Sequence, residues 1–89
     1  MSVSVHPSAI VARGAELGDG VRVGPYCCID SRVVIGEGTV LNAFVTVHDG
    51  VTIGRNCHIY EYTALGGEPQ DHSYRGEASW VRIGDDNVI

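Results

Sequence analysis

The sequence has no lysine, and it contains only one phenylalanine, one tryptophan and one methionine among 89 residues. So few large side chains cannot fill an ordinary globular core, and a chain of this length forms one small domain at most. All six basic residues are arginines spread along the chain, and the formal net charge is −5. A surface for nucleic acid is therefore not expected.

Long apolar runs and a disulfide framework are also missing. No segment has the length of a membrane span and no signal peptide is recognisable, so we expect a soluble, cytoplasmic protein without membrane insertion. The three cysteines are Cys27, Cys28 and Cys57. Their odd number, the adjacent pair and the lack of a CxxC spacing predict free thiols rather than disulfides or a zinc site.

The sequence does contain a six-residue repeat. Steps of six from Val5 to Leu65 meet valine, isoleucine or leucine at eleven consecutive positions, and the residue two places before each is small or β-branched. This period fits neither an α-helical stripe nor a long alternating strand. It predicts short strands joined by tight corners, where glycine, asparagine and aspartate supply the positive φ.

Every third repeat carries an aliphatic residue followed by glycine, at Leu17-Gly18, Ile35-Gly36 and Ile53-Gly54, eighteen residues apart. Three repeats therefore make one turn of a parallel β-helix with a triangular section, with turns about 4.8 Å apart. We expect an all-β fold of about four to five turns. Its inward aliphatic residues would form three columns: Val5/Val23/Leu41/Ile59, Val11/Ile29/Val47/Leu65 and Leu17/Ile35/Ile53.

The repeat breaks in the segment LGGEPQDHSYRGEASWVRIG, residues 65–84. The third column predicts an aliphatic residue where Asp71 stands, and it resumes only at Ile83-Gly84, twelve residues late. We therefore predict an insertion at about 67–78, looping out of a single β-helical domain of residues 1–89. The alternative, one degenerate turn, would bury Asp71 and Glu77, and buried unpaired carboxylates are costly.

The last residue, Ile89, falls in register as an inward residue, and no capping segment follows it. An open solenoid end exposes core side chains and unpaired strand groups. We therefore expect the chain to be part of a longer protein.

The four histidines do not predict a metal site within one chain. They are His6, His48, His58 and His72, and they occupy different positions of the eighteen-residue turn, so no two should stack. A metal site shared between subunits stays open as an alternative. Cys27 and Cys57 fall in the small inward position and are expected to pack in the core, with Cys28 at a corner or outside.

The aromatic residues and the insertion suggest contacts outside the core. Phe44, Tyr60 and Tyr62 are predicted to point outward from their strands and form a packed subunit face, with Trp80 where the strand re-enters. The insertion gathers six hydrogen-bonding side chains, from Gln70 to Arg75. Long loops on rigid scaffolds often carry function, so we predict ligand binding here. Asp71 beside Gln70 is suited to hold sugar hydroxyls or to orient a catalytic group.

Several segments together resemble one family. They are His6–Val11 (HPSAIV), Gly14–Gly18, Val23–Cys27, Ile35–Leu41, Ile59-Tyr60 and the motif PQD-x-x-Y-x-GE at Pro69–Glu77. The series resembles the N-terminal part of bacterial UDP-N-acetylglucosamine acyltransferases, the hexapeptide-repeat enzymes that begin lipid A synthesis. The resemblance implies a left-handed β-helix, although crossovers between parallel strands are ordinarily right-handed. It also implies a cytoplasmic homotrimer with active sites between subunits.

These enzymes transfer a hydroxyacyl chain from acyl carrier protein to the 3-hydroxyl of UDP-N-acetylglucosamine, and the resemblance implies the same substrates here, with no cofactor. The motif match assigns substrate contact to Asp71 and, alongside it, Gln70. In the family a histidine acts as general base on the sugar hydroxyl. None of the four histidines matches it, so we expect the base beyond Ile89 and expect the 89-residue chain to be inactive alone.

One position of the substrate-binding loop departs from the family pattern, because Ser73 stands where a lysine is common. A neutral hydroxyl cannot replace an ammonium group opposite phosphate or carboxylate. Either an arginine such as Arg75 takes over that charge, or the nucleotide or acyl donor is handled differently. The alternatives are another sugar-nucleotide acyl- or acetyltransferase of the hexapeptide class, a non-catalytic β-helical assembly module, and a trimeric metalloenzyme of the carbonic anhydrase type.

Overall fold

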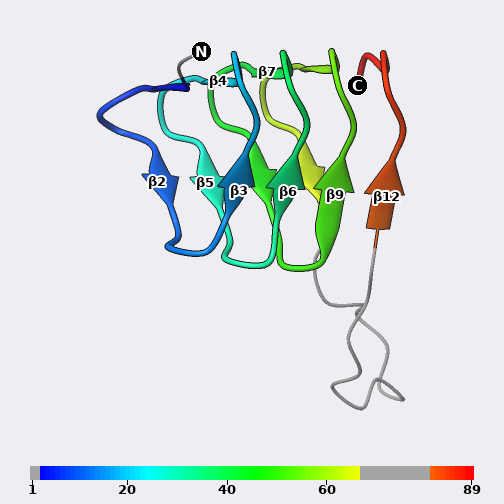
Figure 1. Ribbon diagram of the computed structural model, residues 1–89. Helices are drawn as coiled ribbons and strands as arrows, with labels where there is room; N and C mark the ends of the chain where they lie inside the picture. The colour runs from blue at the N-terminus through cyan, green and yellow to red at the C-terminus, as the bar shows by residue number, and fades with distance from the viewer. Residues whose placement is uncertain (1–2, 67–80) are drawn as a thin grey trace.

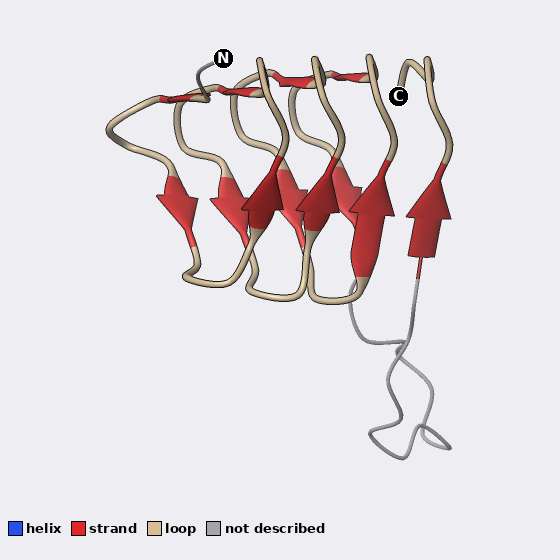
Figure 2. Cartoon of the chain, in the orientation of Figure 1, coloured by secondary structure: helices blue, strands red, loops and turns tan. Residues whose placement is uncertain are grey.

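The computed structural model describes residues 3–66 and 81–89, which coil through twelve short strands (Figures 1 and 2). The strands are β1 (Ser4–Val5), β2 (Ile10–Val11), β3 (Glu16–Leu17), β4 (Arg22–Val23), β5 (Cys28–Ile29), β6 (Val34–Ile35), β7 (Val40–Leu41), β8 (Thr46–Val47), β9 (Val51–Ile53), β10 (His58–Ile59), β11 (Ala64–Leu65) and β12 (Val81–Ile83). Over these two ranges no helix is long and apolar enough to cross a membrane.

The strands form the three sides of a triangular prism. Sheet A contains β1-β4-β7-β10, sheet B contains β2-β5-β8-β11, and sheet C contains β3-β6-β9-β12, all paired in parallel. We name the prism edges by the sheets that they join in chain order: the A–B edge, the B–C edge and the C–A edge. The predicted parallel β-helix is confirmed.

The coil is left-handed, as the family resemblance implied. In Figure 1 the chain advances from left to right, the front strands β3, β6 and β9 run upward, and β2 and β5 behind them run downward. That sense of rotation along that direction of advance is left-handed. The usual right-handed rule concerns crossovers that pack a helix back onto a sheet. Here tight corners replace the crossover helices, so that packing constraint does not operate.

The register gives three regular turns and one longer turn. Val5, Val23, Leu41 and Ile59 stack at eighteen-residue intervals. Ile83 then lies opposite Ile53, thirty residues away, where Ile53 lies opposite Ile35 at the usual eighteen. The difference, thirty minus eighteen, is the twelve extra residues that the sequence predicts. The regular turns number three, slightly fewer than the expected four to five. The bounds 67–78 of the insertion lie outside the described residues.

The core consists of the stacked inward residues. Its fully buried aliphatic side chains include Ile29, Ile35, Leu41, Ile53 and Ile59, and the small inward positions hold valine, Thr39, Cys27 and Cys57. Thr39 is the buried polar residue of this core, and its hydroxyl donates to the Gly54 carbonyl at 2.8 Å and accepts from the Cys57 amide at 3.1 Å. Its burial is therefore matched by hydrogen bonds. The predicted inward packing of the two cysteines is confirmed.

The aliphatic-glycine dipeptides belong to sheet C, and close approach of successive turns explains their glycine. A Cβ built at Gly36 would lie 2.6 Å from the Gly54 carbonyl carbon, and one at Gly18 would lie 2.8 Å from the Glu37 nitrogen. Any side chain there would force backbone to move. The glycine that marks each turn in the sequence is thus required by packing between turns.

The corners place several residues at positive φ. The C–A edge has Gly20, Gly38, Asn56 and Asp86 in this conformation. The A–B edge instead has Tyr26, Phe44 and Tyr62, at φ of 59°, 59° and 62°. A left-handed conformation costs a residue with a large side chain roughly 1–2 kcal/mol. Phe44 and Tyr62 are exposed, as predicted, but their placement on strands is wrong, because each strand ends three residues earlier and both residues lie at corners.

Candidate functional site

The predicted substrate-contact residues Gln70, Asp71 and Ser73 lie outside the described residues. The described residues on either side of them in the chain are Gly66 and Val81. Both positions are at the B–C edge, because β11 belongs to sheet B and β12 to sheet C. The Val81 amide donates to the Gly50 carbonyl at 2.9 Å, which fixes the point of return.

Gly66 is required at the point of departure. Its φ is +79°, and a Cβ added there would lie 2.7 Å from Cγ2 of Val51 and 3.5 Å from Cβ of His48. Both the conformation and the space therefore favour glycine.

A cluster of charged residues lies at the same B–C edge as Gly66, after β5 and β8. His48 Nδ1 is 3.8 Å from Asp30 Oδ2, and Arg32 Nε is 3.7 Å from Asp49 Oδ2. The backbone joins the two pairs, since the Asp49 amide donates to Asp30 Oδ2 at 3.1 Å and the Arg32 amide donates to Asp49 Oδ1 at 3.1 Å. All four side chains are about half exposed, so each ion pair contributes less than about 1 kcal/mol.

The sequence analysis did not predict the His48–Asp30 pair, because it compared the histidines only with one another. The signal was present, because the two residues are eighteen apart and so occupy the same position in successive turns. At 3.8 Å the contact is too long for a hydrogen bond. The pair is a polar surface next to the loop base rather than an assembled acid–base dyad.

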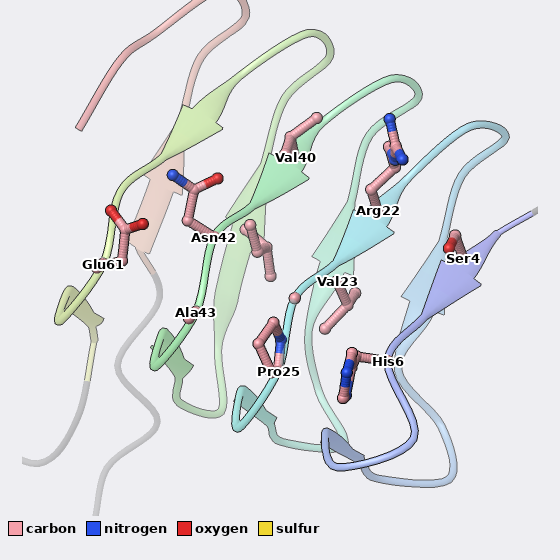
Figure 3. Close-up of a pocket in the computed structure, with 11 residues that line it drawn as sticks. Ser4, His6, Arg22, Val23, Pro25, Val40, Asn42, Ala43 and Glu61 are labelled. Carbon is pink, nitrogen blue, oxygen red and sulfur yellow. The ribbon is translucent and has the colours of Figure 1, made fainter.

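A second candidate surface is an open groove of about 520 Å³ on sheet A (Figure 3). Its polar lining consists of Ser4, His6, Arg22, Asn42 and Glu61. The His6 ring is held, because the Ser8 amide donates to its Nδ1 at 3.1 Å. That nitrogen must then be the acceptor, so the neutral ring carries its proton on Nε2. The groove therefore offers hydrogen-bond donors from His6 and Arg22 and a carboxylate from Glu61.

The groove and the loop base lie on different sides of the prism. The groove is on sheet A, whereas the chain departs toward residues 67–80 from the opposite, B–C edge. Figure 3 shows His6, Arg22 and Asn42 on successive turns of the same face. One chain therefore does not bring this groove together with the departure points of the predicted loop.

The described histidines do not converge on a metal site. His58 lies in β10 of sheet A, His6 directly follows β1 of the same sheet, and His48 directly follows β8 of sheet B. Within residues 3–66 and 81–89 no group of three potential ligands is close enough to hold a metal. His58 Nε2 is 3.0 Å from Asn42 Oδ1, and its ring stacks on Tyr60 at 4.5 Å. The fourth, His72, lies outside the described residues.

Cys27 has the properties of a packing residue. Its thiol is buried and donates to the Asn42 carbonyl at 2.9 Å. Burial raises the pKa of the Cys27 thiol, although backbone hydrogen bonds oppose this effect. Because the thiolate is the reactive form, a nucleophilic role for Cys27 is disfavoured.

Three comparisons with known proteins indicate similarity to bacterial transferases built of hexapeptide repeats. Residues 32–67 match the family model of the bacterial transferase hexapeptide (six repeats). The acyl-[acyl-carrier-protein]–UDP-N-acetylglucosamine O-acyltransferase of a Psychrobacter species is 41% identical over 85 residues, which covers 96% of this chain and 33% of that protein. The resemblance to UDP-N-acetylglucosamine acyltransferases is confirmed.

Solved structures agree with the sequence match. LpxA from Acinetobacter baumannii superposes with a TM-score of 0.92 at 39% identity, covering 96% of this chain and 33% of that one. The UDP-N-acetylglucosamine acyltransferase of Francisella novicida gives 0.91 at 42% identity, covering 96% and 31%. The chain thus spans about one third of the length of the acyltransferases that it matches.

Proposed function

We propose that this chain is part of an acyltransferase that moves a hydroxyacyl group from acyl carrier protein to the 3-hydroxyl of UDP-N-acetylglucosamine. The sugar hydroxyl loses its proton to a base, its oxygen bonds to the thioester carbonyl carbon, the carbon–sulfur bond breaks, and the thiol of the carrier leaves. The observation that carries the proposal is 41% identity over 96% of the chain, together with a TM-score of 0.92 at 39% identity.

The role that we propose for this chain is to hold a substrate-binding loop on a rigid coil. Asp71 and Gln70 would accept and donate hydrogen bonds to the sugar hydroxyls, and Ser73 would contact the same ligand without supplying charge. The strand register supports an insertion between Gly66 and Val81, since the turn from Ile53 to Ile83 is twelve residues longer than a regular turn. A single domain with its loop at about 67–78, acting in a cytoplasmic homotrimer, is part of the proposal.

The test is Asp71→Asn in the natural protein. The assay supplies UDP-N-acetylglucosamine and acyl carrier protein that bears a hydroxyacyl group, and it measures release of the carrier thiol. Removing the carboxylate should lower kcat/KM by about 10- to 100-fold, because a charged acceptor facing sugar hydroxyls is lost. Asp86→Asn is the matched control, since Asp86 is an exposed carboxylate at the C–A edge, and its kcat/KM should not change. Equal activity of Asp71→Asn and the unsubstituted protein would contradict the loop assignment.

One observation favours a second candidate, a sugar-nucleotide acyltransferase with another donor. The chain has no lysine, and Ser73 leaves the loop without an ammonium group at the position where the family commonly has one. The same assay with acetyl-coenzyme A in place of the acyl carrier protein distinguishes the two. A higher kcat/KM with the coenzyme A donor would favour the second candidate.

A further inference from the structure

The groove on sheet A contains an arginine whose charge is not compensated. Arg22 stands in the outward column of the sheet, in register with Ser4 on one side and Val40 on the other, and neither neighbour is charged. In the part of the chain that the structure describes, Arg22 forms no ion pair, whereas Arg32 at the B–C edge faces Asp49. This part of the groove therefore attracts an anion, even in a chain with a net charge of −5.

His6 supplies a fixed hydrogen-bond donor at the same end of the groove. The Ser8 amide donates to its Nδ1 at 3.1 Å, and Ser8 Oγ, which accepts from the Tyr26 amide at 3.0 Å, lies 2.8 Å from the same nitrogen. The neutral ring therefore keeps its proton on Nε2. Among the described residues Nε2 has no partner. Because the ring is already held, a ligand that accepts from Nε2 does not have to order it.

Gly24 leaves a gap in the row of side chains that follows sheet A. His6 stands one turn before Gly24 and Asn42 one turn after it, and all three line the groove. A Cβ built at Gly24 would lie 2.9 Å from the Asn42 carbonyl carbon and 3.0 Å from the Leu41 carbonyl oxygen. Packing between turns therefore requires glycine here. The hollow between His6 and Asn42 is thus a fixed feature of the coil.

The other end of the groove combines a donor with an acceptor. Asn42 Oδ1 is 3.0 Å from His58 Nε2, so this oxygen is engaged and the amide nitrogen keeps its hydrogens for another partner. Glu61, on the next turn, adds a carboxylate to the lining. A hydroxyl group both donates and accepts, so it satisfies both side chains. An ammonium group would pair with Glu61 but would leave the Asn42 amide hydrogens unpaired.

We propose that the groove on sheet A binds a phosphorylated polyol, with its phosphate at the end that holds His6 and Arg22 and its hydroxyl groups toward Glu61. Donors on two different turns suit a tetrahedral phosphate, whereas one arginine alone can hold a planar carboxylate in a bidentate pair. Arg22 and Glu61 are two turns apart, about 10 Å at the ordinary strand spacing. A six-carbon polyol with a terminal phosphate has a length of this order. The inference does not depend on the proposed acyl transfer and names a ligand other than its substrates.

The experiment is isothermal titration calorimetry of the natural protein with sorbitol 6-phosphate, inorganic phosphate and sorbitol. Sorbitol 6-phosphate reaches both ends of the groove, so its dissociation constant should be lower than that of either fragment by about tenfold or more. Absence of saturable binding, or equal constants for sorbitol 6-phosphate and inorganic phosphate, overturns the inference.

Two variants test the phosphate end. Arg22→Met removes the guanidinium group and keeps an apolar stem, and it should raise the dissociation constant of sorbitol 6-phosphate about tenfold or more. His6→Asn keeps a side-chain acceptor for the Ser8 amide and removes the Nε2 donor, and it should raise the constant about fivefold. The matched control is Arg13→Met at the B–C edge, which removes the same charge and should change nothing. Unchanged binding in both groove variants, with folding checked by circular dichroism, contradicts the inference.

A third variant tests the hydroxyl end. Glu61→Ala reproduces the residue found one turn earlier at Ala43, so the coil accepts it. It should weaken binding of sorbitol 6-phosphate about fivefold and should not weaken binding of inorganic phosphate. Excess UDP-N-acetylglucosamine should not displace sorbitol 6-phosphate, and displacement would identify the sugar nucleotide as the occupant and overturn the inference. Binding of sorbitol 6-phosphate by a natural protein without acyltransferase activity would support this inference while the proposed function fails.

Discussion

The A–B and C–A edges of the prism both have corners at positive φ, but different residues occupy them. After each sheet C strand the chain has glycine in all four turns, at Gly18, Gly36, Gly54 and Gly84. At the equivalent position after sheet A the residues are His6, Gly24, Asn42 and Tyr60. The corner residues at positive φ are Gly20, Gly38, Asn56 and Asp86 at the C–A edge and Tyr26, Phe44 and Tyr62 at the A–B edge. Backbone of the next turn lies within 3 Å of a Cβ built at Gly18, Gly36 or Gly54 at the C–A edge. At the A–B edge the same is true of Gly24, whereas the other three turns hold a side chain at this position.

This difference separates two reasons for a residue at a corner. Where a Cβ would collide with the next turn, packing dictates glycine and the residue says nothing about partners. Where side chains fit, their identity can be used for binding. The aromatic residues of the A–B edge therefore carry information about function that the glycines of the C–A edge cannot carry. Each of the following substitutions tests one part of that contrast.

The largest effect is expected from Gly36→Ala, compared with Asn42→Ala in the corresponding position of sheet A. The new methyl group at Gly36 would lie within 2.6–2.8 Å of the backbone of Gly54 and Arg55, so turns must separate. We expect a loss of about 3 kcal/mol or more in the free energy of unfolding, measured by urea denaturation. Asn42→Ala should lose about 1 kcal/mol, through its 3.0 Å contact with His58 Nε2. Equal losses would show that the two edges are not differently constrained.

A smaller effect is expected at Gly20, where φ rather than space favours glycine. Its φ is +74°, but a Cβ there would meet nothing closer than 3.8 Å. Gly20→Ala should therefore lose about 1 kcal/mol of unfolding free energy by strain alone. Gly20→Asn should lose less, because asparagine tolerates this conformation and Asn56 already adopts it at the same edge. A loss for Gly20→Asn as large as for Gly20→Ala would mean that contacts, not φ, decide this position.

The sequence predicted the fold well because the six- and eighteen-residue periods follow directly from which residues point inward. The columns through Leu41 and Ile53, and the twelve-residue offset before Ile83, depend only on that counting. The handedness of the coil does not follow from these periods, since the same period fits coils of either hand. Its prediction came from the family resemblance alone. The aromatic residues were placed wrongly because alternation along a strand was continued past Leu41 and Ile59, where the strands end.

The candidate site was less predictable, for physical reasons. The His48–Asp30 pair and the groove around His6 arise from residues one turn apart, and an eighteen-residue spacing of unlike polar groups leaves no pattern as regular as the aliphatic columns. The assignment of Asp71, Gln70 and Ser73 came from a motif rather than from geometry, and it stays a prediction. What the periods determine is the scaffold, whereas the site depends on individual side chains.

The smallest effect concerns Cys27, the inward residue that follows Tyr26 at the A–B edge. Burial raises the pKa of its thiol, so the folded protein holds this proton at a pH where the unfolded chain has released it. Its contribution is fully present below about pH 9 and is lost as the pH rises through the folded pKa. In Cys27→Ala the free energy of unfolding should therefore decline less steeply as the pH rises above about 9 than in the unsubstituted protein. Urea denaturation at each pH measures this, and parallel curves would show that the Cys27 thiol ionises as readily inside the A–B edge as in water.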